Sequence, residues 1–343
     1  MASLLQTTVT GSLEVSGSSI IMPNLSASVY SGSGGQMWID DAENLLLKFT
    51  QAGSYGSFNS PYTCLGAWSA GGNLITAIFR GYGVGTQNEG LMFGGNPALA
   101  CTEEYDGSTW TAGGAMITAL RNVEGAGTQN AGLQIGGEDA ANAKKSCVQE
   151  YNGSSWAAGG ALITARDNAG AGGFQNAAII FGGHTPSIVS CTEEYNGSSW
   201  AAGGTMITAR CYLTGFGTQN AAFATLGYTP SVNTTNTELY DGTSWSVTNP
   251  IITPGRIAAA SAGIQDKGLV FGGSNPTKLS CTDEWNGISW TLGCNMITAR
   301  NDMGGAGTQD AALSIGGNAD AEVTTTEEYT KTFLPPFTYD AAP

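Results

Sequence analysis

The chain has 343 residues, enough for one large domain or two medium ones. Glycine accounts for 51 residues and charged residues for only 11% of the chain, which is unlike an average globular enzyme. The formal charge of −15 predicts a surface that repels phosphate backbones and anionic membranes, so we expect no nucleic-acid partner. No apolar run is long enough for a membrane span, and we expect no secretion signal, because the N-terminus lacks basic and apolar regions.

The first part of the chain, residues 1–60, differs in character from the rest. Polar and apolar residues alternate over residues 5–18, as in β-strands, and residues 36–49 are expected to form a hairpin. Calcium binding at Asp40, Asp41 and Glu43 is conceivable, but a charged hairpin turn is the favoured interpretation. Because the segment has few core-forming residues, we expect it to be stabilised by a neighbouring subunit.

Residues 64–332 contain a repeat marked by tryptophan. The spacings between successive tryptophans are 42 to 46 residues, which is the period of β-propeller blades. In five repeats a Tyr or Trp lies five residues before the marker, with Asp-Gly or Asn-Gly between them, as in a tight hairpin turn. The six markers are Trp68, Trp110, Trp156, Trp200, Trp245 and Trp290.

Each repeat contains four predicted strands, named a to d. Strand a is rich in glycine and alanine, as in residues 125–128, and a Gln-Asn or Gln-Asp pair follows it. Strand b ends in Gly-Gly, except in the fourth repeat, where Gly227-Tyr228 stands in its place. Strand c reads Thr-Glu-Glu-Tyr, and strand d begins at the tryptophan. The small side chains of strand a predict that it lies nearest the axis of the ring.

The two ends of the repeat region complement each other. The last strand c, residues 326–329, has no tryptophan strand after it, and Trp68 has no strand c before it. We therefore expect the strand around Trp68 to complete the last blade and to close the ring. These patterns resemble the kelch repeat, and the resemblance implies an all-β fold: a six-bladed kelch-like β-propeller with a short N-terminal β-rich anchoring segment. Residues 333–343 are expected to form a C-terminal tail.

Residues that recur in every blade are interpreted as structural. The six arginines are taken as one per blade at the same place, each pairing with a glutamate or a carbonyl group between blades. The seven cysteines are expected to be free, buried thiols, which suits assembly in a reducing cytosol. The arginines are Arg80, Arg121, Arg166, Arg210, Arg256 and Arg300.

The sequence offers little material for catalysis. His184 is the only histidine, which argues against a Ser-His-Asp triad or a multi-histidine metal site. Paired carboxylates such as Glu103 and Glu104 could serve a glycosidase, but they recur from blade to blade. The sequons at Asn152 and Asn196 lie in predicted hairpin turns and are discounted. We predict no enzyme activity, no cofactor and no metal.

The whole chain resembles structural proteins of tailed phages, especially marine ones, in its general sequence character and not through one diagnostic motif. The resemblance implies a virion fibre or a capsid or tail appendage, assembled in the host cytoplasm. Residues 1–60 would dock to other virion proteins, with Trp38, Leu45 and Phe49 as docking candidates, and a homo-oligomer such as a trimer is expected. A cellular kelch-type adaptor and a carbohydrate-active propeller enzyme remain as alternatives.

The two faces of the predicted ring differ in regularity. Antiparallel strands place the a–b and c–d turns on one face and the b–c loops on the other. The turns are nearly identical between blades, whereas the b–c loops vary and contain scarce cationic groups. Binding specificity often lies in such loops, although drift in solvated loops explains the variation equally well. The candidates for contact with a host receptor or glycan are Lys144, Lys145, His184, Tyr228 and Lys278.

Overall fold

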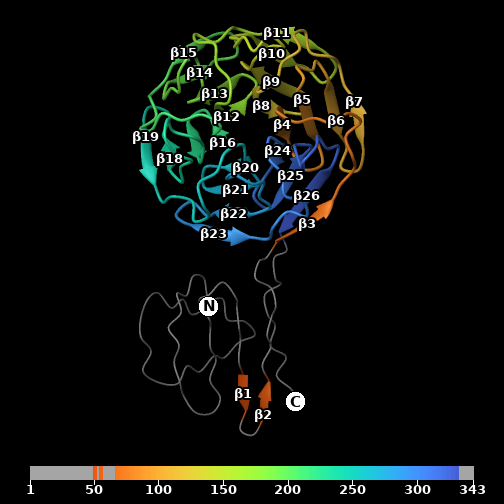
Figure 1. Cartoon of the computed structure of the whole chain (residues 1–343), viewed down its shortest axis with the longest axis vertical. Helices are drawn as coiled ribbons and strands as arrows, with labels where there is room; N and C mark the ends of the chain where they lie inside the picture. Colours follow the sequence, from red (N-terminus) through yellow and green to blue (C-terminus); the bar gives the residue numbers. More distant parts are fainter. Residues whose placement is uncertain (1–48, 52–53, 57–65, 332–343) are drawn as a thin grey trace, which may run out of the picture. The chain divides into compact units, whose positions relative to one another are not determined.

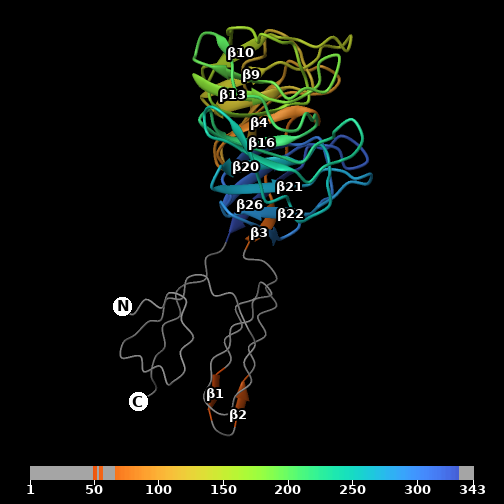
Figure 2. The same ribbon diagram turned by 90° about the vertical axis from the view of Figure 1, so that its left-hand side faces the viewer.

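The computed structural model describes residues 49–51, 54–56 and 66–331, in which every regular element is a β-strand. Residues 66–331 form six four-stranded antiparallel sheets, arranged as blades around a central axis (Figure 1). Figure 2 shows the same strands after a quarter turn. The prediction of an all-β, six-bladed propeller is confirmed.

Blades 1 to 5 each use four consecutive strands, in the order a, b, c, d. Blade 1 contains β4 (Gly81–Gly85), β5 (Gly90–Gly94), β6 (Thr102–Tyr105) and β7 (Trp110–Ala112). Blade 2 contains β8 (Glu124–Thr128), β9 (Ala131–Ile135), β10 (Val148–Tyr151) and β11 (Trp156–Ala158). Blade 3 contains β12 (Gly170–Phe174), β13 (Ala177–Phe181), β14 (Thr192–Tyr195) and β15 (Trp200–Ala202). Blade 4 contains β16 (Thr214–Thr218), β17 (Ala221–Thr225), β18 (Thr237–Tyr240) and β19 (Trp245–Thr248). Blade 5 contains β20 (Ala260–Ile264), β21 (Lys267–Phe271), β22 (Thr282–Trp285) and β23 (Trp290–Gly293).

Blade 6 joins the two ends of the propeller. It contains β24 (Gly304–Gly307), β25 (Ala311–Ile315), β26 (Thr326–Lys331) and, as its outermost strand, β3 (Gly66–Ala70). β3 runs antiparallel to β26, with Trp68 opposite Tyr329. The predicted closure of the ring by the strand around Trp68 is therefore confirmed.

From residues 1–65 the structure describes one short antiparallel hairpin. It consists of β1 (Phe49–Gln51) and β2 (Ser54–Gly56). The compact unit that holds the propeller spans Gly66–Lys331. Several predictions fall outside the described residues, namely the tail 333–343, the roles of Asp40, Asp41, Glu43, Trp38 and Leu45, and all but Phe49 of the hairpin predicted over 36–49.

Strand a is the innermost strand of each blade, as its small side chains predicted. The a strands of neighbouring blades contact one another around the axis. A Cβ atom on Gly305 would lie 2.5 Å from the carbonyl oxygen of Ser261 in the neighbouring blade. Glycine is needed at this position because two backbones approach each other closely.

The glycine pair after strand b links each blade to the next. Both residues have positive φ, with 63° at Gly182 and 94° at Gly183, a region that favours glycine. The N–H group of Gly183 donates to the carbonyl oxygen of Arg210, in the next blade, at 2.9 Å. Equivalent bonds join Gly95 to Leu120, Gly137 to Arg166, Gly227 to Arg256, Gly273 to Arg300 and Gly317 to Ile78.

Blade 4 keeps this link but replaces the first glycine. Leu226 has a φ of 62° and Gly227 a φ of 98°, which match the two glycines of blade 3. The sequence-based alignment of Gly227-Tyr228 with Gly-Gly is therefore wrong by one residue. Tyr228 follows the pair and holds the place that His184 has in blade 3.

Six glutamines, one in each a–b turn, hold each blade to the one before it. Gln129 Nε2 donates to the carbonyl oxygen of Gly90 at 3.0 Å and to that of Tyr105 at 2.7 Å. We call this pair of bonds the glutamine clasp, and it accounts for the recurring Gln-Asn or Gln-Asp of the repeat. The other clasps are made by Gln87, Gln175, Gln219, Gln265 and Gln309.

A second set of bonds joins the c strands of neighbouring blades. Tyr195 donates its hydroxyl proton to Glu150 Oε1, in the preceding blade, at 2.6 Å. Between blades 4 and 5 both partners are replaced together, and Leu239 packs against the apolar cluster that contains Trp285. The equivalent donors elsewhere are Tyr105, Tyr151, Tyr240 and Tyr329.

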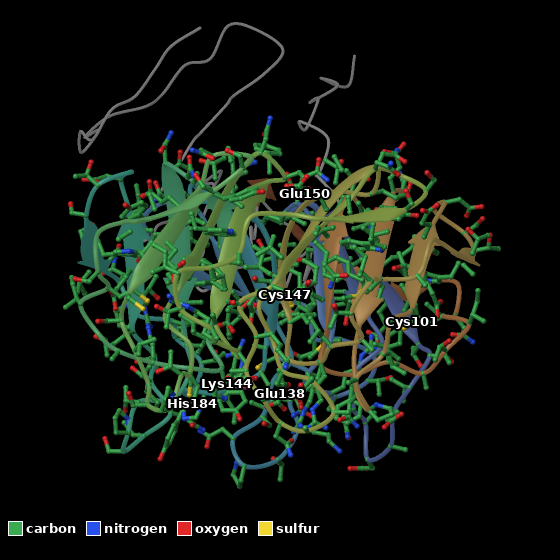
Figure 3. All side chains as sticks on the ribbon, turned by 90° about the horizontal axis from the view of Figure 1, so that it is seen from above. Cys101, Glu138, Lys144, Cys147, Glu150 and His184 are labelled. Atoms are coloured by element: carbon green, nitrogen blue, oxygen red, sulfur yellow. The ribbon has the colours of Figure 1, made fainter. Side chains whose placement is uncertain are left out.

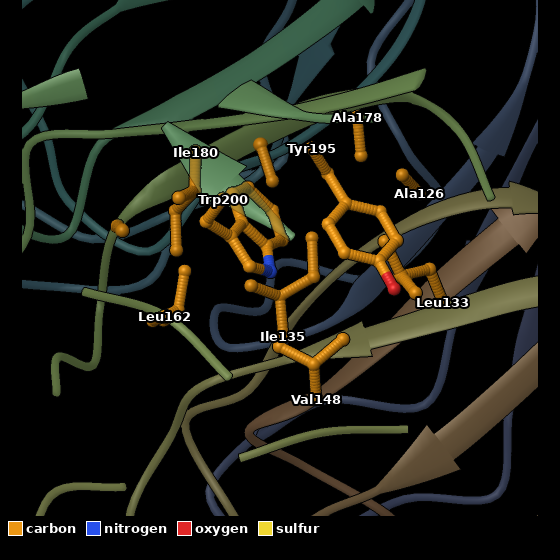
Figure 4. Packing of buried hydrophobic residues seen from close by; sticks show 11 residues of the cluster. Ala126, Leu133, Ile135, Val148, Leu162, Ala178, Ile180, Tyr195 and Trp200 are labelled. Atoms are coloured by element: carbon orange, nitrogen blue, oxygen red, sulfur yellow. The ribbon is translucent and has the colours of Figure 1, made fainter. Parts of the chain in front are cut away.

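Apolar side chains fill the space between blades. Figure 4 shows Ile135 and Val148 of blade 2 packed together with Ile180 and Trp200 of blade 3. The core is therefore continuous from one blade to the next, so that no blade has a hydrophobic core of its own.

Four arginines lie fully buried at one equivalent position before strand a, namely Arg166, Arg210, Arg256 and Arg300. Each pairs with an acidic residue of strand c in its own blade, as Arg210 does with Glu238 at 3.0 Å. The prediction of six equivalent arginines, paired between blades, is therefore wrong. Leu120 and Ile78 hold the buried position in blades 2 and 1, and Arg121 and Arg80 come after it.

Blade 2 replaces the whole ion pair by neutral groups. Gln149 stands at the place of the buried acid and accepts hydrogen bonds from the N–H groups of Ile117 at 2.7 Å and Thr118 at 3.0 Å. Its own amide donates to Gln134 Oε1 at 2.8 Å. Blade 2 thus has Leu120 in place of the arginine and Gln149 in place of the acid, so that neither charged partner of the ion pair is present.

The cysteines do not all behave as predicted. Cys294 is disulfide-bonded, so the prediction of seven free thiols is wrong at this residue. The state of Cys294 therefore does not support the expected assembly in a reducing compartment. Burial raises the pKa of the Cys101 and Cys211 thiols to about 11, which keeps them protonated and unreactive at neutral pH. The free thiols among the described residues are Cys101, Cys147, Cys191, Cys211 and Cys281.

The buried ion pair of blade 4 should be replaceable only as a unit. Arg210→Leu leaves the fully buried Glu238 without its cation, which should lower the free energy of unfolding by about 3–5 kcal/mol. Adding Glu238→Gln and Ala224→Gln reproduces the neutral set of blade 2 and should restore most of that loss. Chemical denaturation of the single and triple variants measures both effects. Equal stability of the two variants would contradict this interpretation.

The tyrosine bonds between blades predict a loss of stability in alkali. Burial, and then the hydrogen bond to glutamate, raises the pKa of Tyr105, Tyr151 and Tyr240 from 10.0 to about 12. Because the folded-state pKa is the higher one, this stabilisation is complete below pH 10 and is lost as the pH rises toward 12. Tyrosine absorbance and circular dichroism should therefore change together in this window. Ionisation near pH 10 with unchanged circular dichroism would refute the prediction.

Candidate functional site

The b–c loops and the segments that enter the a strands form one face of the propeller, here called the loop face. The opposite face, with the a–b and c–d turns, is the turn face. Figure 3 shows Glu138, Lys144 and His184 together at the loop face, with Glu150 toward the opposite side. Two of the candidate receptor-contacting residues, Lys144 and His184, therefore lie on the same face of the ring, as expected from the strand directions.

Five b–c loops have a common backbone arrangement in spite of their different sequences. The residue after the glycine pair bridges to the segment entering its own blade and also to a later loop residue, as Glu138 does with Arg121 and Lys144. His184 and Tyr228 occupy the first of these positions, and Lys144 and Lys278 occupy the second. The candidate residues thus sit at equivalent points around the ring. Blade 1 departs from this pattern and has a bridge between Leu99 and Leu120.

The cationic candidates are engaged by acidic residues of the same face. Lys144 Nζ lies 2.7 Å from Asp167 Oδ1, and His184 Nδ1 lies 3.8 Å from the same oxygen. Lys145 pairs with Asp139 at 2.6 Å, and Lys278 with the exposed Asp320 at 2.9 Å. The loop face therefore offers ion pairs and not a set of free positive charges.

A ring of residues with positive φ surrounds the axis at the loop face. Backbone hydrogen bonds connect consecutive members across blade boundaries, for instance from Asn122 N–H to the Arg80 carbonyl at 2.7 Å. Asp302 N–H likewise donates to the Ala258 carbonyl at 3.0 Å. The ring consists of Arg80, Asn122, Asn168, Tyr212, Ala258 and Asp302, with φ values from 49° to 60°.

These six residues form the rim of a cavity on the axis, here called the channel mouth, which has a volume of about 90 Å³. Its inner wall differs between blades, because Tyr82 and Glu124 lie on one side and Ala260 on another. Thr214 Oγ1 and Ser261 Oγ, from blades 4 and 5, lie 2.7 Å apart in the wall. At the channel mouth the side chains therefore do not follow the six-fold repeat, and they form an asymmetric polar set.

Glu124 is the most unusual of these side chains. It is 7% exposed, and the N–H group of Ala169 donates a hydrogen bond to its carboxyl group. Burial, together with the charge of Asp167, raises its pKa well above the usual range. Burial and the nearby Glu124 also raise the pKa of Tyr82. Both groups therefore hold their protons more tightly than the same groups do in water.

The rim adds charged groups to this set. Arg80 Nε lies 3.8 Å from Asp302 Oδ2, and within the described part of the chain this nitrogen has no hydrogen-bond acceptor. Burial raises the pKa of Asp302 in spite of the nearby guanidinium group. Tyr212 is also on the rim, and burial, followed by the charges of Cys211 and Asp167, raises the pKa of its phenol.

The paired glutamates considered for catalysis have structural partners. Glu103 accepts hydrogen bonds from the N–H groups of Ile75 at 2.8 Å and Thr76 at 2.9 Å. Glu104 accepts the hydroxyl proton of Tyr151 from the next blade. Across residues 49–51, 54–56 and 66–331, no group of three or more His, Cys, Asp or Glu residues could hold a metal ion.

The channel mouth was not predicted from the sequence. Its rim residues occupy equivalent places in the six repeats, immediately before strand a, but the arginines had been aligned with one another across this region. A signal was available in the chemical diversity of that position, which holds Arg, Asn, Asn, Tyr, Ala and Asp in successive repeats.

Comparisons with known proteins bear on the fold. No protein-family model matches the chain, and no curated protein matches it significantly. A solved structure entitled "Structure of YjhT" is similar, with a TM-score of 0.64 and 13% sequence identity over 74% of this chain and 95% of that one. At this identity the likeness shows the propeller fold alone. In the described part of the chain, no helix is long and apolar enough to cross a membrane.

Proposed function

We propose that the protein is a non-enzymatic attachment protein whose propeller is a rigid platform for the loop face. The observation that carries this proposal is the contrast between the two faces. On the turn face all six a–b turns repeat the same glutamine clasp, whereas the loop face combines a common backbone with different side chains in each blade. Variable side chains on a fixed scaffold suit specific recognition of one partner.

A binding role is favoured over a catalytic one by the way carboxylates are used. The recurring acids of strand c are engaged in holding the blades, either by arginine or by backbone N–H groups and tyrosine hydroxyls. The ion pairs of the loop face hold neighbouring loops to one another, as Lys278 and Asp320 do between blades 5 and 6. This arrangement supports a preformed surface that binds without large rearrangement.

The biological setting that we propose is the virion of a tailed phage. The kelch-like repeat and its Thr/Gly/Ser-rich opening resemble those of phage fibres and appendages. In this setting residues 1–60 dock to other virion proteins, through side chains such as Trp38, Leu45 and Phe49, and the protein is a homo-oligomer. The loop face contacts the host surface through the positions of Lys144, Lys145, His184, Tyr228 and Lys278.

Charge reversal on the loop face should impair attachment. Lys278→Glu places a negative charge beside Asp320 at the rim of the proposed contact surface, which should slow association with the host several-fold. Adsorption of particles carrying the variant measures the effect, and quantitative mass spectrometry of the purified particles measures incorporation. We expect reduced adsorption with normal incorporation.

Lys267→Glu is the matched control on the turn face. Lys267 belongs to the same blade and pairs with Asp310 at 3.5 Å, so its reversal causes a similar local repulsion. This variant should adsorb like the unmodified protein. Equal loss of adsorption in both variants, or absence of the protein from purified particles, would overturn the proposed function.

A further inference from the structure

We propose that the channel mouth binds one uncharged sugar unit at the end of a surface glycan. This inference rests on the proposed function, because it names the ligand class that the loop face would recognise. The sugar would enter the cavity from the loop face, while the rest of the glycan lies over the b–c loops.

The polar groups of the channel mouth match the needs of a polyhydroxylated ligand. The rim offers the guanidinium group of Arg80 and the amide oxygens of Asn122 and Asn168, whose amide nitrogens already donate to Glu138 and Asp167. The wall adds the carboxyl group of Glu124 and the hydroxyl group of Thr214, which is also hydrogen-bonded to Ser261. Convergent polar groups in a small cavity give a ligand its orientation and its specificity.

Apolar surface is also available for the carbon skeleton of a sugar. Blade 5 contributes Ala258, Ala259 and Ala260 to the cavity, where blades 1 and 2 contribute polar side chains. Tyr212, on the rim, is partly exposed and has an aromatic ring. A sugar ring presents hydroxyl groups and C–H groups in different directions, and a cavity with polar and apolar walls fits both.

Hydrogen-bonding capacity remains unused in this cavity. In blades 4 and 5 the buried acids Glu238 and Asp283 are each neutralised by a buried arginine, whereas the buried Glu103 of blade 1 has no arginine and accepts two backbone N–H groups. Glu124 has no ion-pair partner within residues 66–331, although it is almost fully buried. Arg80 Nε has no acceptor in the same region. A ligand in the cavity would use both of these groups.

The charges around the cavity favour an uncharged sugar over an acidic one. Arg80 is the cationic residue among the described lining residues, and it already lies 3.8 Å from Asp302. The carboxyl groups of Glu124, Asp302 and Asp167 are all crowded into the buried surroundings of the channel mouth, where burial raises the pKa of each. A carboxylated sugar would add a further negative charge to this site in a chain of formal charge −15.

Binding of simple glycosides to the full-length protein tests the inference. The probes are the methyl glycosides of glucose, galactose, mannose, N-acetylglucosamine and glucuronic acid, measured by saturation-transfer NMR and calorimetry. At least one uncharged glycoside should bind. Glucuronide should bind roughly tenfold more weakly, or not at all, because of the additional charge.

Variants of Glu124 locate the binding. Glu124→Ala removes a buried hydrogen-bonding group and should weaken binding about tenfold, whereas Glu124→Gln keeps a donor and an acceptor and should stay within about threefold. Should Glu124→Ala fail to fold, Asn168→Gly removes a rim amide at a φ of 51°, which glycine tolerates, and should also weaken binding. Lys267→Glu, on the turn face, is the control and should bind normally.

The outcomes separate this inference from the proposed function. Failure of every uncharged glycoside to bind, tighter binding of the glucuronide, or equal binding by the unmodified protein and Glu124→Ala would each overturn the sugar site. If particles still adsorb through the loop face in these cases, the proposed attachment function stands. Loss of sugar binding together with normal adsorption in Glu124→Ala would mean that the sugar is not the attachment ligand, and would also overturn the inference.

Discussion

In this propeller a glutamine side chain holds each blade to the preceding one. Its amide group donates two hydrogen bonds to backbone carbonyl oxygens of that blade. The clasp recurs at every interface, including the one where Gln87 of blade 1 reaches Ala312 and Tyr329 of blade 6. In a closed ring the interfaces depend on one another, because opening any of them exposes the apolar side chains packed between two neighbouring sheets. The identical turns of the repeat are a consequence of this constraint.

The same constraint explains which substitutions the repeat tolerates. Where Trp285 replaces the usual tyrosine, Leu239 replaces its glutamate, and where Leu120 replaces a buried arginine, Gln149 replaces the acid. In both cases a polar pair has been exchanged as a whole, so that no buried group loses its partner. Blade 1 differs, because it keeps the buried Glu103 with Ile78 at the arginine position, and there two backbone N–H groups satisfy the carboxylate.

Because the blade interfaces are fixed in this way, the side chains of the loop face can differ between blades. Five of the b–c loops have a common backbone arrangement, so that their side chains can differ without weakening the interfaces between blades. At the axis, six chain segments meet, and their side chains form a single asymmetric cavity with Glu124 in its wall. The proposed attachment function and the proposed sugar site both rest on this separation between a repeated scaffold and an irregular face.

The sequence was sufficient for the blade number, the strand order and the closure by Trp68, because tryptophan spacing and strand pattern are periodic features. It was not sufficient for side chains whose partners lie in other repeats. Arg80 and Arg121 were placed with the buried arginines because shifts of one or two residues do not disturb the period. The place of Glu124 in the cavity wall depends on residues of several blades that only the closed ring brings together.

The most direct test of the account is the thermal unfolding of a variant that lacks β3, residues 66–70. Removal of this strand takes Trp68 from the core and leaves β26 as an unpaired edge. The account predicts that all six blades lose stability together, in one transition at a lower temperature than that of the unmodified protein. An unchanged transition temperature would contradict the claim that the propeller is stabilised as a closed ring.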